Sequence, residues 1–276
     1  MFSRSKGIIM GMTKILFFDI DGTLFTNDFT LPQSVKPALQ KAREHGCKIY
    51  INTGRTLCNI DKKLQELPLD GISMGCGCRV IAEGKTLVST ERSHEESMKI
   101  VDVYRRNKIP TVYESDTGMY FDEANTDDDM IPDWRGYTDK RGLTRFVDEG
   151  DFKAVKMFSK ITDEDDVDKL IGDLKEAGFP FYPIRRSRDG YEIVPEGFTK
   201  ATGIDMVRDY YGVGLEDCYV FGDSENDLSM LRHVPNSVAM GQSPEEVKSC
   251  CSYVTDTPEN DGIEKALKGL GLIPGK

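Results

Sequence analysis

Carboxylates at the ends of two apolar segments are the side chains of this 276-residue sequence best placed for chemistry. Asp19 and Asp21 end or follow the run Lys14 to Asp19, and Asp223 follows the run Cys218 to Phe221. Both runs have the pattern of strands buried in a parallel sheet, whose carboxyl ends meet at one edge. Like charges this close need a counter-ion, and oxygen ligands beside a substrate phosphate favour Mg²⁺. The sequence therefore predicts a Mg²⁺ site.

Four further groups at the same predicted edge suit a phosphate. Thr53 offers a hydroxyl, Gly54 a backbone amide, Lys200 a cation and Asn226 an amide donor. Each alone has a more ordinary interpretation: Asp-Gly is usually a turn, a lone lysine is usually solvated, and Asn226 could be a helix cap. Their occurrence together, each at a strand end or a helix start, favours catalysis.

These groups are positioned by a predicted α/β framework. A helix capped by Ser34 and stopped at Gly46 links the first strand to a second at Cys47 to Ile51, and a right-handed crossover sets the loop 52–55 beside the first strand. The crossover pattern returns near Tyr191, with a helix at Gly203 to Tyr211, the strand at Cys218 to Phe221 and another helix from Leu228. This predicts a doubly wound, mainly parallel, Rossmann-like sheet.

Between these halves the pattern changes to that of an inserted α+β domain. Ser93 and Glu96 form a capping-box pattern, Thr162 precedes a helix that stops at Gly178, and apolar runs between them predict an antiparallel sheet covered by two helices. The predicted divisions are 1–84 and 190–276 for the main domain and 85–189 for the insertion. The acidic run 127–129, followed by Pro132, is interpreted as a solvated loop.

Composition limits the function further. With 36 basic and 47 acidic residues the formal charge is -11, which argues against nucleic acid and anionic membranes as partners. The longest apolar stretches are too short to span a bilayer and 1–12 lacks a signal-peptide core, so we expect a cytoplasmic protein. The seven cysteines form no zinc-ribbon pattern, and we expect reduced thiols without a metal role.

Four motifs together resemble those of the haloacid dehalogenase superfamily of phosphohydrolases. They are FFDIDGTL (Phe17 to Leu24), INTGR (Ile51 to Arg55), Lys200 in GFTKATGI, and GDSENDLSM (Gly222 to Met230). The insertion resembles the large C2-type α/β cap of the Cof-type subfamily. The resemblance spans Lys14 to about Lys268, and the combination of the first and last motifs is highly specific.

The resemblance implies roles for individual residues. Asp19 would be the nucleophile that forms an aspartyl-phosphate, and Asp21 the general acid and base, touching the metal through its backbone carbonyl. Asp223 would be the third metal ligand, with Asp227 orienting it or Lys200 from behind. The phosphate would be bound by the Ile20 amide, Thr53, Gly54, Lys200 and Asn226. The implied activity is Mg²⁺-dependent hydrolysis of a small phosphorylated metabolite, such as a sugar phosphate.

Two alternatives remain open at this stage. A phosphomutase or phosphotransferase would pass the phosphoryl group to a sugar hydroxyl, and a receiver-like signalling module would keep it on the aspartate. The second acid at Asp21 and the long insertion argue against the receiver. Arg55 could bind substrate or pair with an acid, and the segment 75–78 (GCGC) departs from the Asn-Gly-Ala turn of many relatives. The substrate, the specificity residues and the oligomeric state are not predicted; rim candidates are Tyr120, Trp134, Arg185 and Arg188.

Overall fold

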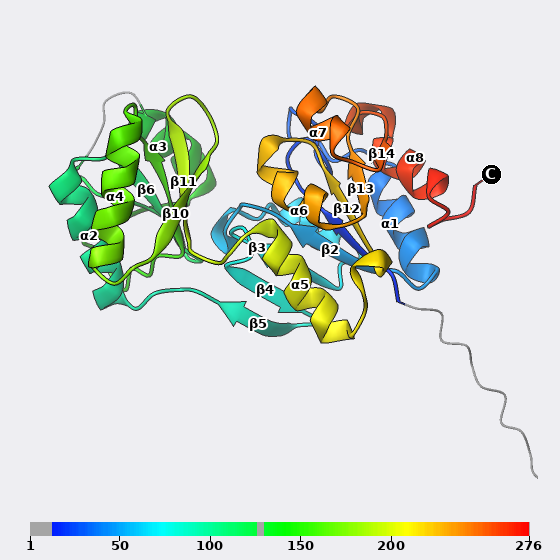
Figure 1. The fold of residues 1–276 in the computed structure, drawn as a ribbon, viewed down its shortest axis with the longest axis horizontal. Helices are drawn as coiled ribbons and strands as arrows, with labels where there is room; N and C mark the ends of the chain where they lie inside the picture. The colour runs from blue at the N-terminus through cyan, green and yellow to red at the C-terminus, as the bar shows by residue number, and fades with distance from the viewer. Residues whose placement is uncertain (1–12, 126–129, 276) are drawn as a thin grey trace, which may run out of the picture.

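The computed structural model describes residues 13–125 and 130–275, which form two sheets with helices around them (Figure 1). The first sheet has the strand order β14-β13-β12-β1-β2-β3-β4-β5. Its strands are β1 (Ile15–Phe18), β2 (Lys48–Asn52), β3 (Gly71–Met74), β4 (Arg79–Ala82), β5 (Lys85–Ser89), β12 (Cys218–Gly222), β13 (Asn236–Ala239) and β14 (Tyr253–Val254).

Helices cover both faces of this sheet, as a doubly wound fold requires. They are α1 (Val35–Glu44), α5 (Lys200–Tyr211), α6 (Leu228–His233), α7 (Glu245–Ser249) and α8 (Gly262–Gly269). Leu16 and Phe18 of β1 pack in one core cluster with α1 and α8, whereas Ile15 and Phe17 pack in another with α5 and α6. Alternate residues of one strand thus enter opposite cores, which explains its unbroken apolar run.

The central strands end level with one another and so bring distant loops together. β1 runs parallel to both β12 and β2, with Phe18 opposite Phe221 on one side and Ile51 on the other. The Asp19 amide donates to the Phe221 carbonyl at 3.0 Å, which extends the pairing to the strand end. The loops that begin at residues 19, 53 and 223 therefore share one edge, as predicted.

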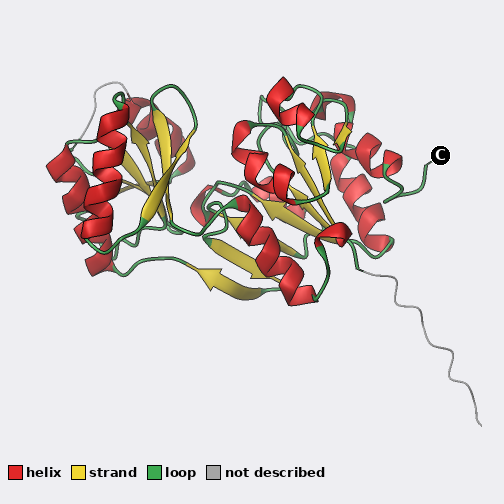
Figure 2. Cartoon of the chain, viewed as in Figure 1, coloured by secondary structure: helices red, strands yellow, loops and turns green. Residues whose placement is uncertain are grey.

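The second sheet has the order β10-β11-β9-β6-β7-β8 and is antiparallel except for β7 and β8 (Figure 2). Its strands are β6 (Thr111–Glu114), β7 (Met119–Phe121), β8 (Thr144–Phe146), β9 (Lys156–Lys160), β10 (Phe181–Arg185) and β11 (Gly190–Pro195), and its helices are α2 (His94–Asn107), α3 (Met130–Arg141) and α4 (Glu164–Glu176). Helices α2 and α4 share one apolar cluster with this sheet, whereas Trp134 of α3 joins a separate cluster with β6 and β7. We call residues 94–195 the cap lobe and the remainder the core lobe.

Several predictions about the insertion need correction. Three helices, not two, accompany the cap sheet. The third, α3, was not predicted because it has no clear apolar stripe and contains Pro132, which is tolerated here because it lies in the first turn. The acidic run 127–129 lies outside the described residues. Strand β5 pairs in the core sheet and β11 in the cap sheet, so the predicted divisions at 84/85 and 189/190 are each displaced by one strand. The Glu83-Gly84 turn, with φ of 48° and 77°, continues the sheet as a tight hairpin.

Two helix starts also differ from the prediction. Ser34 precedes α1, but its hydroxyl donates to Asp261 at 2.6 Å and does not cap the helix. Helix α5 begins at Lys200, three residues earlier than predicted, because Thr199 and Thr202 form a reciprocal capping box. This start places Lys200 at the first helical position. None of the helices in the described part of the chain is long and apolar enough to cross a membrane.

Candidate active site

One buried lysine lies between two buried carboxylates at the edge of the core sheet. The Lys200 Nζ donates to Asp19 Oδ1 at 2.6 Å and to Asp227 Oδ1 at 2.5 Å. All three side chains are almost wholly shielded from solvent. Asn52 of β2 donates from Nδ2 to the Lys200 carbonyl at 2.9 Å and so joins β2 to the start of α5.

The acidic cluster carries more negative charge than Lys200 offsets. Burial is the main cause that raises the pKa of Asp19 to about 7, Lys200 opposes the rise, and Asp227 adds to it. Burial, followed by repulsion from Asp19 and Asp227, raises the pKa of Asp223 to about 8. Burial would lower the pKa of Lys200, but the two carboxylates outweigh it and raise the pKa well above its ordinary value.

Asp223 is held in place from two sides. The Thr23 hydroxyl donates to Asp223 Oδ1 at 3.0 Å, and the Asp223 amide donates to Asp227 Oδ2 at 2.9 Å. Gly22 has a φ of +79°, and a Cβ at this position would clash with the Asp223 carboxylate. Only glycine suits this turn, because it tolerates both the positive φ and the close approach.

The cluster fits a divalent cation. Carboxylate oxygens of Asp19, Asp223 and Asp227 lie within 4.8 Å of one another. Both oxygens of Asp227 already accept hydrogen bonds, from Lys200 and from backbone amides, so Asp19 and Asp223 are the better candidates for metal ligands. Burial and mutual repulsion raise the pKa of both carboxylates, and a bound cation would offset that repulsion. Whether the Asp21 backbone carbonyl joins them stays a prediction.

Asp21 lines the same cavity as Asp19, but its side chain is exposed, unlike those of the buried cluster. Its exposed carboxylate accepts a hydrogen bond from Arg55 Nε at 2.8 Å and a second one from the other side of the same guanidinium. Arg55 also donates to the Asn59 carbonyl at 3.2 Å. In this structure Arg55 therefore pairs with an acid, one of the two roles considered for it, and the acid is the predicted general acid and base.

The predicted phosphate-binding groups face the same space. Thr53 and Gly54 follow β2, and the Thr53 amide donates to the Ser73 carbonyl at 2.9 Å. The Ser224 hydroxyl donates to Asn226 Oδ1 at 2.6 Å, which leaves the Asn226 Nδ2 as a free donor group. The Ile20 side chain is buried in the apolar core, so only its backbone could contact a substrate.

A cavity of about 210 Å³ connects these groups to the cap lobe. Six of the predicted or considered residues line it: Asp19, Asp21, Thr53, Gly54, Arg55 and Asn226. The cap lobe contributes four charged residues that the sequence analysis missed and one aromatic rim candidate: Glu114, Lys156, Arg186, Glu192 and Trp134. Lys156 and Glu192 could have been identified from the sequence, because each is a charged residue inside an otherwise apolar strand, in VKMF and in YEIVP. Of the other rim candidates, Tyr120 packs in the cap core and Arg185 pairs with Glu164.

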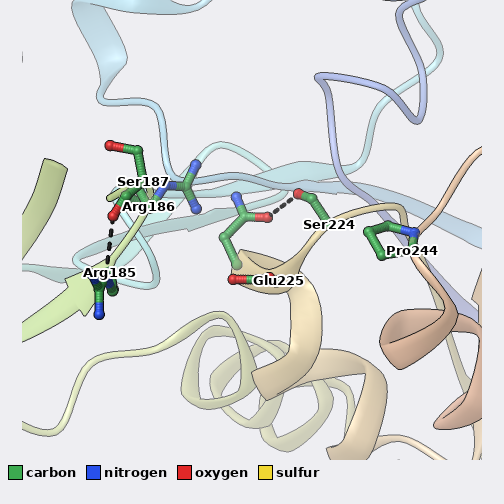
Figure 3. Close-up of a pocket in the computed structure, with 7 residues that line it drawn as sticks. Arg185, Arg186, Ser187, Ser224, Glu225 and Pro244 are labelled. Atoms are coloured by element: carbon green, nitrogen blue, oxygen red, sulfur yellow. Dashed lines mark hydrogen bonds between the residues drawn. The ribbon is translucent and has the colours of Figure 1, made fainter. Parts of the chain in front are cut away.

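A second hollow of about 450 Å³ adjoins this cavity between the β10–β11 turn and the segment after β12 (Figure 3). Three residues line both spaces: Arg186, Ser224 and Asn226. In Figure 3 the Arg186 guanidinium extends from the cap turn toward the core lobe. The two spaces thus offer a route from solvent to Asp19 between the lobes.

Comparisons with known proteins agree with this geometry. The model of the family described as haloacid dehalogenase-like hydrolase matches residues 16–267. YkrA of Bacillus subtilis is 26% identical over 263 residues, covering 95% of this chain and 99% of the relative. The 5-amino-6-(5-phospho-D-ribitylamino)uracil phosphatase YitU of Bacillus subtilis is 26% identical over 272 residues, covering 92% and 96%.

Solved structures are similar over nearly the whole chain. The subclass IIB sugar phosphatase BT4131 is 29% identical with a TM-score of 0.75, covering 94% of this chain and all of its own. The phosphatase BT1666 from Bacteroides thetaiotaomicron is 26% identical with a TM-score of 0.79, covering 98% of this chain and all of its own.

Proposed function

The chain belongs to the haloacid dehalogenase-like hydrolases, and we propose that it is a Mg²⁺-dependent phosphomonoesterase that acts on a small phosphorylated metabolite through an aspartyl-phosphate on Asp19. Its relatives include phosphatases of a sugar and of a phosphoribityl compound, which supports a metabolite as the substrate. The observation that carries the proposal is the placement of Lys200 between Asp19 and Asp227, beside Asp223 and beneath a cavity lined by Thr53, Gly54 and Asn226.

In the proposed first step, Asp19 attacks phosphorus. Oδ1 of Asp19 accepts from Lys200, so Oδ2 is the oxygen available for the new bond. The bond between phosphorus and the leaving oxygen breaks as this bond forms. Lys200, the Thr53 hydroxyl, the Gly54 amide and the Asn226 amide would hold the phosphoryl oxygens. A Mg²⁺ held by Asp19 and Asp223 would supply further positive charge to those oxygens.

Asp21 would transfer the protons. It would protonate the leaving oxygen in the first step. In the second it would take a proton from the water that attacks phosphorus, as the bond between Asp19 and phosphorus breaks and inorganic phosphate is released. The paired guanidinium of Arg55 fixes the orientation of the Asp21 carboxylate at the cavity. To donate a proton, Asp21 must be protonated at the expense of this ion pair, so we propose that substrate binding alters the contact with Arg55.

The proposal is tested by hydrolysis of p-nitrophenyl phosphate with and without Mg²⁺. We expect turnover that needs the metal and that falls at least about 1,000-fold in Asp19→Asn, which removes the nucleophile. Asp168→Asn, an exposed aspartate of α4, is the matched control and should keep full activity. Turnover in Asp19→Asn equal to that of the unmodified protein would overturn the proposal. With sugar phosphates, free phosphate indicates hydrolysis, and an isomeric phosphosugar without release indicates transfer.

A further inference from the structure

A cluster of buried charges in the cap lobe faces the reaction cavity and has no part in the mechanism above. Lys156 Nζ lies 2.7 Å from Glu114 Oε1 and 3.2 Å from Glu192 Oε1. Arg186 Nε lies 3.6 Å from the same Glu192 oxygen. Less than a tenth of the side chain of Glu114, Lys156 and Glu192 is exposed, although all three line the cavity.

Glu192 has fewer hydrogen bonds than a buried carboxylate needs. Glu114 accepts hydrogen bonds from Lys156 at 2.7 Å and from the Thr56 hydroxyl at 3.2 Å. Within the described ranges, Glu192 accepts from Lys156 and, at 3.4 Å, from the weak thiol donor of Cys76, with Arg186 more distant at 3.6 Å. No backbone amide within 13–125 or 130–275 is found to donate to it. A carboxylate can accept about four hydrogen bonds, and a buried one is costly without them, so Glu192 has accepting capacity left toward the cavity.

The free capacity of Glu192 lies beside the phosphate-binding loop. A Cβ added at Gly54 would lie 3.4 Å from Glu192 Oε1 and 3.6 Å from the Cys76 sulfur. The part of a substrate next to its phosphoryl group would therefore meet this carboxylate. Burial raises the pKa of Glu192, but Lys156 and Arg186 outweigh burial and lower the pKa, so the group is an ionised acceptor at neutral pH.

We call the four charged cap residues that line the cavity the cap wall, and their charges indicate which leaving groups fit. The wall contains two cations, Lys156 and Arg186, and two anions, Glu114 and Glu192. This wall has no excess cation for a second phosphate or a carboxylate, and its acceptors favour hydroxyl donors. The part of the leaving group next to the phosphoryl group would lie in the cavity of about 210 Å³.

We propose that Glu192 is a specificity-determining residue that accepts a hydrogen bond from a leaving-group hydroxyl, and that the substrates are phosphate monoesters of small neutral polyols. This inference rests on the proposed phosphomonoesterase function. Lys156 and Arg186 act through Glu192 as positioning residues that keep it ionised and aimed at the cavity.

The first test uses the unmodified protein and matched substrate pairs. Glycerol 3-phosphate is compared with n-propyl phosphate, which has the same three-carbon chain without the hydroxyls. Glucose 6-phosphate is compared with cyclohexylmethyl phosphate, in which a CH₂ group replaces the ring oxygen and the hydroxyls are absent. Because a hydrogen bond to a charged group is the stronger kind, we expect kcat/KM to be about 10- to 100-fold higher for the hydroxylated member of at least one pair. Equal values in both pairs would overturn the inference.

The second test uses Glu192→Gln, with the exposed Glu196→Gln on the same segment as control. The ratio of kcat/KM for glycerol 3-phosphate to kcat/KM for n-propyl phosphate should fall at least about 10-fold in Glu192→Gln and should persist in Glu196→Gln. An equal loss on both substrates would assign Glu192 a purely structural role and overturn the inference, as would an unchanged preference.

The two proposals fail separately. The phosphomonoesterase proposal fails if the unmodified protein hydrolyses p-nitrophenyl phosphate no faster than Asp19→Asn does. The specificity inference fails if hydrolysis depends on Asp19 but the paired substrates are hydrolysed equally well. If Glu192→Gln does not fold, the substrate pairs with the unmodified protein still decide the matter. A carboxylated substrate, 3-phosphoglycerate, should be hydrolysed more slowly than glycerol 3-phosphate, and faster hydrolysis would contradict the charge argument.

Discussion

Replacement of Lys200 by methionine tests whether one buried cation holds the acidic cluster together. The substitution keeps an apolar chain of similar length but leaves Asp19 and Asp227 buried without their shared partner. Removal of one member of a buried ion pair costs about 3–5 kcal/mol, because the remaining charge is uncompensated. We expect a loss of this size in the free energy of unfolding of the metal-free protein at pH 8.

The loss should depend on pH in a definite direction. The pKa of Asp19 rises from 3.8 to about 7 on folding, so ionising this group lowers the stability of the unmodified protein as pH rises toward 7. Lys200 opposes that rise, so its removal raises the pKa of Asp19 further. In the unmodified protein the contribution of Asp19 to the pH dependence levels off above pH 7. In the variant Asp19 still ionises above pH 7, so the free energy of unfolding continues to fall by up to about 1.4 kcal/mol per pH unit.

Urea unfolding in the presence of EDTA at pH 6, 7 and 8 measures both effects. Lys265→Met is the matched control, since the Lys265–Asp256 pair is largely exposed and its loss should cost far less stability than the loss of the buried pair. A Lys200→Met loss no larger than that of the control, or a difference that does not grow between pH 7 and pH 8, would refute the reasoning.

Two further substitutions test the neighbouring groups. Gly22→Ala should weaken Mg²⁺ binding at least about 10-fold, because the added methyl group would clash with Asp223 and the positive φ is unfavourable for alanine. The shift of the thermal unfolding midpoint with added Mg²⁺ measures the binding, and a titration equal to that of the unmodified protein would contradict the prediction. Asp21→Asn should lower kcat/KM about 100-fold or more for n-propyl phosphate but much less for p-nitrophenyl phosphate, because kcat/KM reports the first step and p-nitrophenolate leaves in it without protonation. Steady-state kinetics on the two substrates check this, and an equal fall in kcat/KM would count against Asp21 as the general acid.

Local pattern was sufficient to predict the edge of the core sheet. The unbroken apolar runs before Asp19 and Asp223 predicted strands covered on both faces, and the structure confirms that β1 and β12 are adjacent and parallel. Lys200 was expected at the same edge among the groups that suit a phosphate, whereas Asp227 was expected there only from the family resemblance. The structure brings these four side chains into one cluster, as expected.

Local pattern did not decide where the chain passes between the lobes. Strand β5 is mostly exposed or half-buried and lacks a strong apolar signal, so its pairing in the core sheet depends on the hairpin with β4. Helix α3 was missed for a similar reason, since its interior contains Gly136 and its charges do not fall on one face.

The sequence by itself determined which residues end the core strands, and therefore the chemistry proposed for this protein. Only the tertiary structure decided that Arg55 pairs with Asp21, and that Glu192 of the cap lobe lines the same cavity as Gly54. The physical reason is the range of the interactions. The periodicity of a buried strand is a local property, whereas the approach of residues 138 positions apart depends on how the cap lobe is placed beside the core lobe.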